Sequence, residues 1–165
     1  MDVFRHHRVS GFTIAEFIVV IIIVGIMAAM ALPRWIGSDT GLNAQAEALA
    51  ADIRFAQSLA MTQATHYRST VLSGNTYNTT HASGTPVLNP TKGTATVTLN
   101  DSVVFGTLTG LPSNLIAFDG QGVPYTDSAA TTTPLATTAT IPLTVSSSTC
   151  TLQITQATGK VSVSC

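Results

Sequence analysis

The chain opens with a contrast between polar and apolar positions. Residues 12–32 are nearly all apolar, and the eleven residues before them carry Arg5 and Arg8. A helix of these 21 residues would be about 31 Å long at about 1.5 Å per residue, which matches a bilayer core of about 30 Å. Cations ahead of such a block favour a cytoplasmic N-terminus. The pattern predicts a transmembrane helix over 12–32, with the following residues facing outward.

A second helical pattern lies within residues 33–65, and it has an apolar and a polar side. From Gly41 onward, apolar residues return every three or four positions. The stripe consists of Leu42, Ala46, Leu49, Ile53, Ala56 and Ala60, and Phe55 and Leu59 widen it. This spacing is typical of an amphipathic helix. We expect it to continue the first helix after a bend, to end near Thr65 and to pack under a sheet.

Residues 66–165 show short runs of strand-forming residues separated by Gly, Pro, Asn and Asp. The predicted strands are 67–72, 76–80, 95–99, 103–108, 115–118, 141–145, 149–155 and 160–164. Hairpin turns are expected at 74–75, 119–122 and 157–160. The Thr-rich stretch 126–140 has little to bury and is expected to be an exposed loop. The sequence thus predicts an α+β fold, with a long N-terminal helix packed on an antiparallel β-rich head.

The charge content narrows the possible functions. Charged residues make up 9% of the chain, and the formal net charge is −1. Phosphate binding normally needs clustered Lys and Arg. Within 33–165 there are six anions, and the five cations are scattered: Arg34, Arg54, Arg68, Lys92 and Lys160. This balance argues against nucleic acid as a partner.

No catalytic constellation emerges from the sequence. His66 and His81 are isolated from any Cys, Glu or Asp at metal-ligand spacing. Asp101, Asp119 and Asp127 carry oxygen ligands suited to Ca²⁺, but they form no D-x-D-x-D loop, and turn or cap roles fit them better. We therefore expect no enzyme activity, no bound metal and no cofactor.

Three interpretations of the N-terminal segment compete. A conventional secretory signal peptide would use 17–27 as its apolar region and would be cut after Ala31, in Ala29-Met30-Ala31. A plain membrane anchor would stay uncut. A leader comprising residues 1–11 would instead be cut ahead of the apolar block, after Gly11.

Glu16 distinguishes these interpretations. A carboxylate within a membrane helix is costly, and neither a signal peptide nor a simple anchor has a use for it. Cleavage after Gly11 would give Phe12 a free cationic α-amine, with Glu16 four residues further on. In an apolar filament interior, Glu16 could pair with the amine of a neighbouring subunit.

The segment Gly11-Phe12-Thr13-Ile14-Ala15-Glu16, followed by an unbroken apolar run, resembles the prepilin peptidase site of type IV pilins and type II secretion pseudopilins. The resemblance implies cleavage after Gly11, N-methylation of Phe12 and guidance of assembly by Glu16. Family members often carry a helix break where this chain has Gly25 and Pro33, and the stretch between can unwind in a filament. Residues 31–35, Ala-Leu-Pro-Arg-Trp, are similar to a segment of MSHA-type pilins.

Later segments resemble the GspH/FimT group of minor pilins. They are Ile53-Arg54-Phe55-Ala56-Gln57-Ser58, the turn Phe118-Asp119-Gly120-Gln121-Gly122-Val123-Pro124, and the Thr158-Gly159 of the closing hairpin. The resemblance implies the pilin fold and, as partners, other pilin or pseudopilin subunits, the prepilin peptidase and the inner-membrane assembly platform. It implies a single-pass protein of the bacterial inner membrane, with its head in the periplasm, that later enters a pilus or pseudopilus.

The two cysteines, Cys150 and Cys165, flank the predicted last hairpin. In an oxidising compartment disulfides persist. A bridge here would close a loop of about 16 residues and stabilise the fold by roughly 3 kcal/mol. Two free thiols are the alternative, because a sequence does not show distance or direction.

The sequence therefore supports a structural minor pilin or pseudopilin subunit of a type IV pilus or type II secretion filament. One alternative is a binding module at a filament tip, which would contact a surface, DNA or a secreted substrate. The other is an exported β-rich protein whose signal peptide is cut after Ala31.

Overall fold

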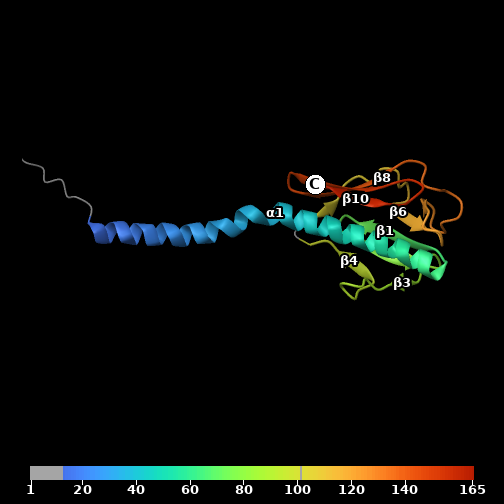
Figure 1. The fold of residues 1–165 in the computed structure, drawn as a ribbon, viewed down its shortest axis with the longest axis horizontal. Coiled ribbons are helices and arrows are strands. Elements are labelled where there is room, and N and C mark those ends of the chain that lie inside the picture. Colours follow the sequence, from blue (N-terminus) through green and yellow to red (C-terminus); the bar gives the residue numbers. More distant parts are fainter. Residues whose placement is uncertain (1–12, 101) are drawn as a thin grey trace, which may run out of the picture. The chain divides into compact units, whose positions relative to one another are not determined.

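The computed structural model describes residues 13–100 and 102–165, with the side chains of residues 29–40 left aside. The chain forms two compact units, Met1–Gly37 and Ser38–Cys165, and each is described by itself. Figure 1 shows the order of the elements along the chain.

One helix, α1 (Ile14–Gln63), runs through both predicted helical stretches. Thr13 caps its start, because the backbone N–H of Glu16 donates to the Thr13 carbonyl at 3.1 Å and lies 3.3 Å from Thr13 Oγ1. The helix continues across Gly25 and Pro33, so the expected break does not interrupt it in this single chain. Both residues weaken a helix only locally. Unwinding between them inside a filament stays a prediction.

The first unit contributes the N-terminal part of α1. All side chains from residue 13 to residue 28 are exposed, so this part of the helix has no packed face. Across the described residues, no helix is both long enough and apolar enough to span a membrane.

In the second unit, α1 buries one face against the strands. The buried positions, each at most 2% exposed, are Leu42, Ala46, Leu49, Ala50, Ile53, Ala56 and Ala60. Most are alanines, whose small side chains let the helix lie close to the sheets. Phe55 and Leu59 lie half-buried beside this face. The predicted apolar stripe and its packing under the sheets are thereby confirmed.

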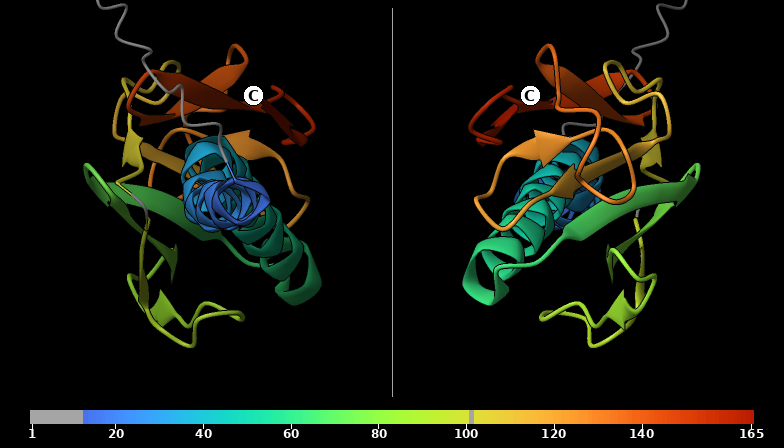
Figure 2. Two further views of the ribbon diagram at one scale, coloured as in Figure 1. Left: turned by 90° about the vertical axis from the view of Figure 1, so that its left-hand side faces the viewer. Right: turned by 90° about the vertical axis from the view of Figure 1, so that its right-hand side faces the viewer.

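The larger sheet has six antiparallel strands in the order β3-β2-β1-β6-β7, and β4 also pairs with β2. The strands are β1 (Tyr67–Ser73), β2 (Thr76–His81), β3 (Pro86–Val87), β4 (Thr96–Thr98), β6 (Leu115–Phe118) and β7 (Pro124–Tyr125). Figure 2, viewed along α1, shows β1 and β2 in green beside the helix.

The smaller sheet has four antiparallel strands in the order β10-β9-β8-β5. They are β5 (Val104–Phe105), β8 (Ala139–Val145), β9 (Ser148–Ile154) and β10 (Val161–Ser164). Alternate residues of β8 and β9 point into the core, including the fully buried Leu143, Leu152 and Ile154. Both sheets and α1 thus share one hydrophobic core, and the predicted α+β fold is confirmed.

All eight predicted strands are present, although β5 is shorter than the predicted 103–108. The pattern missed β3 and β7, two-residue strands that each begin with proline. Proline lacks a backbone donor and is confined to strand starts and sheet edges, so such short strands leave no alternating signal.

The prediction of an exposed loop over 126–140 is wrong in part. Ala139 and Thr140 belong to β8. Ahead of them, the segment lies along the free edge of β7: Thr126 donates to the Thr133 carbonyl at 2.8 Å, and Leu135 to the Pro124 carbonyl at 2.9 Å. Ala130 forms a small second core with Leu115, Ala117 and Tyr125. The segment therefore covers a sheet edge and one sheet face, which its Thr-rich composition concealed.

Candidate functional site

The candidate site is the exposed N-terminal part of α1. The expected cleavage and methylation positions, Gly11 and Phe12, lie outside the described residues. Glu16 is in the first turn of the helix and carries the sole charge of residues 13–28. A carboxylate in this position is favoured by the partial positive charge of the helix N-terminus. The exposed side chain is free to meet a cationic group from another molecule.

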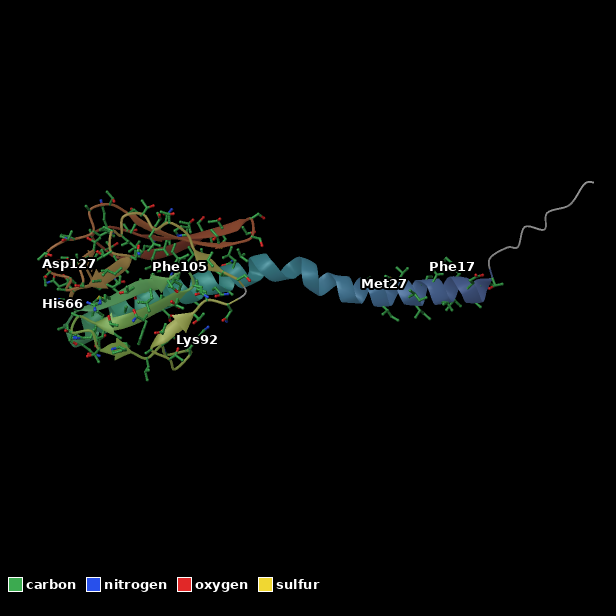
Figure 3. The ribbon with its side chains drawn as sticks, turned by 180° about the vertical axis from the view of Figure 1, so that it is seen from behind. Phe17, Met27, His66, Lys92, Phe105 and Asp127 are labelled. Atoms are coloured by element: carbon green, nitrogen blue, oxygen red, sulfur yellow. A yellow bond between two sulfur atoms is a disulfide. The ribbon has the colours of Figure 1, made fainter. Side chains whose placement is uncertain are left out.

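The apolar side chains around Glu16 have no partners within the unit. The large ones between residues 14 and 27 are 44–82% exposed. They belong to nearly four turns of helix and so point in every direction about its axis. Figure 3 shows two of them, Phe17 and Met27, projecting from the helix. A helix that is apolar all round is normally buried on every side.

The composition of this surface suits packing against other helices. Isoleucine and valine predominate between residues 18 and 26, and their branched side chains are held in one rotamer on a helix, so little entropy is lost when they pack. At Gly25, a side chain would meet no atom within 4 Å. The stretch offers a stiff apolar cylinder with a small notch, and lipid chains or neighbouring helices are the surroundings that fit it.

The head is held on α1 by polar contacts that come from the helix itself. Gln57 Nε2 donates to the Gly122 carbonyl at 2.8 Å and to the Thr158 carbonyl at 2.9 Å. The first acceptor lies in the β6–β7 turn and the second in the β9–β10 turn, so one amide joins the two sheets. Arg54 adds a hydrogen bond from Nη2 to the Val161 carbonyl at 3.0 Å.

The two turns reach Gln57 because glycines allow a close approach. Gly122 and Gly159 have φ values of +80° and +63°, which favour glycine. A side chain on Gly159 would lie 2.7 Å from Gln57 Nε2 and 2.8 Å from a ring carbon of Phe118. Asp119 shapes the first turn by accepting the N–H groups of Gln121 and Val123, each at 2.9 Å. The hairpin turns expected at 119–122 and 157–160 are therefore confirmed.

A buried polar cluster ties α1 to the edge of the larger sheet. Asp52 is 8% exposed, and its Oδ2 accepts from the Tyr77 hydroxyl and from Asn89 Nδ2, both at 2.6 Å. Burial, together with the hydrogen bond and the charge of Asp52, raises the pKa of Tyr77 well above its ordinary value. Asn89 in turn accepts the N–H groups of Thr91 and Lys92 and so shapes the β3–β4 connection.

The cysteines form a disulfide between Cys150 and Cys165, with their Cα atoms 4.1 Å apart. Because Ser164 pairs with Thr151 in the β9–β10 ladder, the next pair along the ladder brings the two cysteines opposite each other. The predicted bridge is thus present, and it ties the last strand to its neighbour.

Two of the three aspartates considered for Ca²⁺, Asp119 and Asp127, accept hydrogen bonds from backbone N–H groups. Although desolvation acts to raise it, hydrogen bonds from the N–H groups of Thr133, Thr131 and Thr132 hold the pKa of Asp127 below its ordinary value. Asp119 accepts the N–H groups of Gln121 and Val123. Asp101 lies outside the described residues. Across the described ranges, no three His, Cys, Asp or Glu side chains gather in a way that could hold a metal ion.

Sequence reasoning missed the polar contacts of Asp52, Asn89 and Gln57. Asp52 and Asn89 are 37 residues apart, and Gln57 is 101 residues from Thr158. One signal was available for Gln57, because it stands in a segment that resembles the minor pilins. No comparable signal marked Asp52.

Together, the fold and the exposed helix define a pilin-like protein: a long N-terminal helix, apolar at its start, that carries an antiparallel β-rich head. Known proteins agree. The chain is 41% identical, over 58 residues, to the type IV narrow pilus major component PilA5 of Thermus thermophilus; the match covers 34% of this chain, which thus spans about half the length of that relative.

Solved structures extend the comparison to the head. The type IV minor pilin FimU of Pseudomonas aeruginosa matches with a TM-score of 0.54 and 18% identity, over 77% of this chain and 90% of FimU. A second crystal form of FimU gives a TM-score of 0.52 and 15% identity, over 75% and 93%. At this identity the likeness shows a common fold. No protein-family model matches the chain. The resemblance to type IV pilins is confirmed.

Proposed function

We propose that the protein is a structural subunit of a type IV pilus, built into the filament through the exposed apolar part of α1. The observation that carries the proposal is the exposure of residues 13–28 on all sides of a helical segment whose one charge is Glu16. A surface of this kind needs apolar surroundings in every direction. Neighbouring copies of the same helix supply them in a filament, and a lipid bilayer supplies them beforehand.

In this proposal, the subunit lies in the bacterial inner membrane before filament assembly, with the β-rich head in the periplasm. Residues 1–11 are a leader that the prepilin peptidase removes after Gly11, and Phe12 is then methylated. The assembly platform moves the subunit into the filament, where Glu16 meets the α-amine of a neighbouring subunit. In an apolar interior, an unpaired charge of either sign is disfavoured, so this pairing sets the axial position of the helix.

The likeness of the head to FimU, a minor pilin, supports a minor role. A second candidate is a major pilin, because the PilA5 sequence match is to a major component. A third candidate is a subunit of a type II secretion pseudopilus. The amount of the subunit per length of purified filament separates the first two roles: sparse incorporation supports a minor pilin, and a filament made chiefly of this chain supports a major one.

Substitution of Glu16 tests the assembly step. We expect Glu16→Ala to leave the subunit in the membrane fraction with an intact head, and to reduce its recovery in sheared filaments at least tenfold. Glu16→Asp, which keeps the charge, is the matched variant and should retain part of the incorporation. Wild-type incorporation of Glu16→Ala would contradict the role given to this carboxylate.

A further inference from the structure

The buried Asp52 carries a charge that has no role in the proposed packing of the N-terminal part of α1 into a filament. Its Oδ2 accepts two hydrogen bonds, one from Tyr77 and one from Asn89. The 2.6 Å distance from the Tyr77 hydroxyl oxygen is typical of a hydroxyl donating to an ionised carboxylate. Among the described residues, the one ion pair joins Arg54 and Glu47, so Asp52 has neutral donors but no cation.

The second oxygen of Asp52 remains open. Two buried side-chain polar atoms in the described part of the chain lack a hydrogen-bond partner, Asn78 Oδ1 and Thr80 Oγ1. Asp52 Oδ1 is not among them, although no described residue bonds to it, so it keeps contact with solvent. The carboxylate therefore has one oxygen fixed from inside the head and one oxygen available from outside.

A small hollow lined by both polar and apolar residues adjoins this carboxylate. Besides Asp52, Tyr77 and Asn89, it is lined by Phe55, Thr79, Val87, Leu88, Ala95 and Val97. Its volume of about 10 Å³ corresponds to one water-sized group. Leu88, one of the apolar lining residues, is 63% exposed. The hollow thus combines the Asp52 carboxylate, room for one donor group and a set of apolar lining residues. This set, called the apolar collar below, consists of Phe55, Val87, Leu88, Ala95 and Val97.

A primary ammonium on an aliphatic stem matches these features. The ammonium is compact and has three donors, whereas a guanidinium is a wider planar group. The methylene stem of a lysine is apolar and can lie along the collar while its charged end meets the carboxylate. The hollow therefore selects lysine over arginine.

The sequence has two lysines, Lys92 and Lys160. Lys92 belongs to the β3–β4 connection next to the hollow, and its Nζ lies 3.5 Å from the Thr98 carbonyl (Figure 3). Lys160 is exposed in the β9–β10 turn, and no hydrogen bond or ion pair engages its ammonium among the described residues. Of the two lysines, Lys160 is thus the one whose ammonium is left to complement Asp52.

We propose that Asp52 and its apolar collar form a binding site for a lysine ammonium, and that Lys160 of a second copy of the chain occupies it. The choice of a second copy rests on the proposed function, because a filament brings many heads together. The contact would give the heads a specific lateral partner, in addition to the apolar packing of their helices.

The chemistry of the site can be tested without a filament. The full ¹⁵N-labelled chain in detergent micelles is titrated with n-butylammonium chloride, guanidinium chloride or sodium chloride at equal ionic strength. We expect saturable shifts of the Asn89 side-chain amide and the Leu88 backbone amide with butylammonium, at least tenfold weaker with guanidinium and absent with sodium. Equal responses to all three salts would overturn the proposal.

Three variants distinguish loss of the binding site from misfolding of the head. Asp52→Asn should abolish the butylammonium response, and Asp127→Asn, which removes a charge elsewhere on the head, should keep it. Leu88→Ala should weaken binding through the collar while leaving the hydrogen bonds of Asp52 intact. A response that survives Asp52→Asn, or that Leu88→Ala does not change, contradicts the site.

The identity of the lysine is tested in assembled filaments with a zero-length carbodiimide cross-linker and peptide mass spectrometry. We expect an intermolecular link between Asp52 and Lys160 that Lys160→Gln removes and Lys92→Gln retains. A link from Asp52 to Lys92 of the same chain, or filaments with no link at Asp52, would overturn the second-copy assignment and leave the proposed function standing. Failure of the wild-type chain to enter filaments would overturn both.

Discussion

The side-chain amide of Gln57 lies 2.9 Å from the carbonyl oxygen of Thr158, across 101 residues of sequence. The same nitrogen also reaches the Gly122 carbonyl at 2.8 Å. A single helix residue therefore holds a turn of each sheet, and the head is fastened to the element that we propose enters the filament.

Removal of this amide should weaken the head. Gln57→Ala leaves two carbonyls without their donor, and each lost hydrogen bond costs about 1 kcal/mol. We expect the free energy of unfolding of the full chain in detergent to fall by about 2 kcal/mol, measured by denaturant titration. Gln153→Ala is the control, because Gln153 is exposed on β9, and its effect should stay within about 0.5 kcal/mol. Equal effects of the two variants would contradict the role of Gln57.

Gly159 should tolerate substitution less well than a glycine of similar backbone conformation. Gly159→Ala brings a methyl group to 2.7 Å from Gln57 Nε2, with φ at +63°. Gly93 has a φ of +66° with no atom within 4 Å of an added side chain. We expect Gly93→Ala to cost about 1–2 kcal/mol, from backbone strain alone, and Gly159→Ala to cost a further 1–3 kcal/mol, from overpacking. Thermal unfolding of both variants measures the difference, which would vanish if the β9–β10 turn were loosely packed.

The disulfide should be a substantial part of the stability of the head. In the chain-entropy description, closing its short loop stabilises the fold by roughly 3 kcal/mol. We expect the Cys150→Ala/Cys165→Ala variant to lose about this amount relative to the oxidised wild type. Wild-type protein under reducing conditions should move toward the variant, whereas the variant itself should not respond to reductant. An unchanged unfolding midpoint in the reduced wild type would show that the bridge contributes nothing.

The hydrogen bonds to Asp127 should make the 126–133 segment sensitive to acid. A carboxyl group whose pKa is lowered by folding stabilises the folded state above its unfolded pKa, and this stability is lost as pH falls through the folded pKa. We therefore expect the amide signals of Thr131, Thr132 and Thr133 to shift together as pH falls below the ordinary pKa of aspartate. Asp127→Asn should remove this transition in an NMR titration. A midpoint at or above the ordinary value for aspartate would contradict the arrangement.

Much of the head followed from the sequence because its elements have regular periods. The α1 stripe from Leu42 to Ala60 and the alternation along β8 and β9 each place apolar residues on one face, and burial follows. The 126–140 segment was mispredicted because its role depends on a sheet edge formed by Pro124 and Tyr125, a strand too short to leave a pattern.

The polar contacts were harder to predict from the sequence, for a different reason. The hydrogen bond of Asp52 with Asn89 depends on how α1, β2 and the β3–β4 connection meet, and local propensity carries no information about that meeting. The candidate assembly site shows the opposite situation. Its features are the apolar run and the single carboxylate of Glu16, both of which are properties of the sequence itself.

The most direct test of the pilus-subunit proposal is the N-terminus of the mature protein. Mass spectrometry of the subunit isolated from membranes and from sheared filaments should find a chain that begins at Phe12, with an N-methyl group on its amine. A chain that begins at Leu32 would mean that a signal peptidase had removed the apolar helix together with Glu16, and it would contradict the assignment as a pilus subunit.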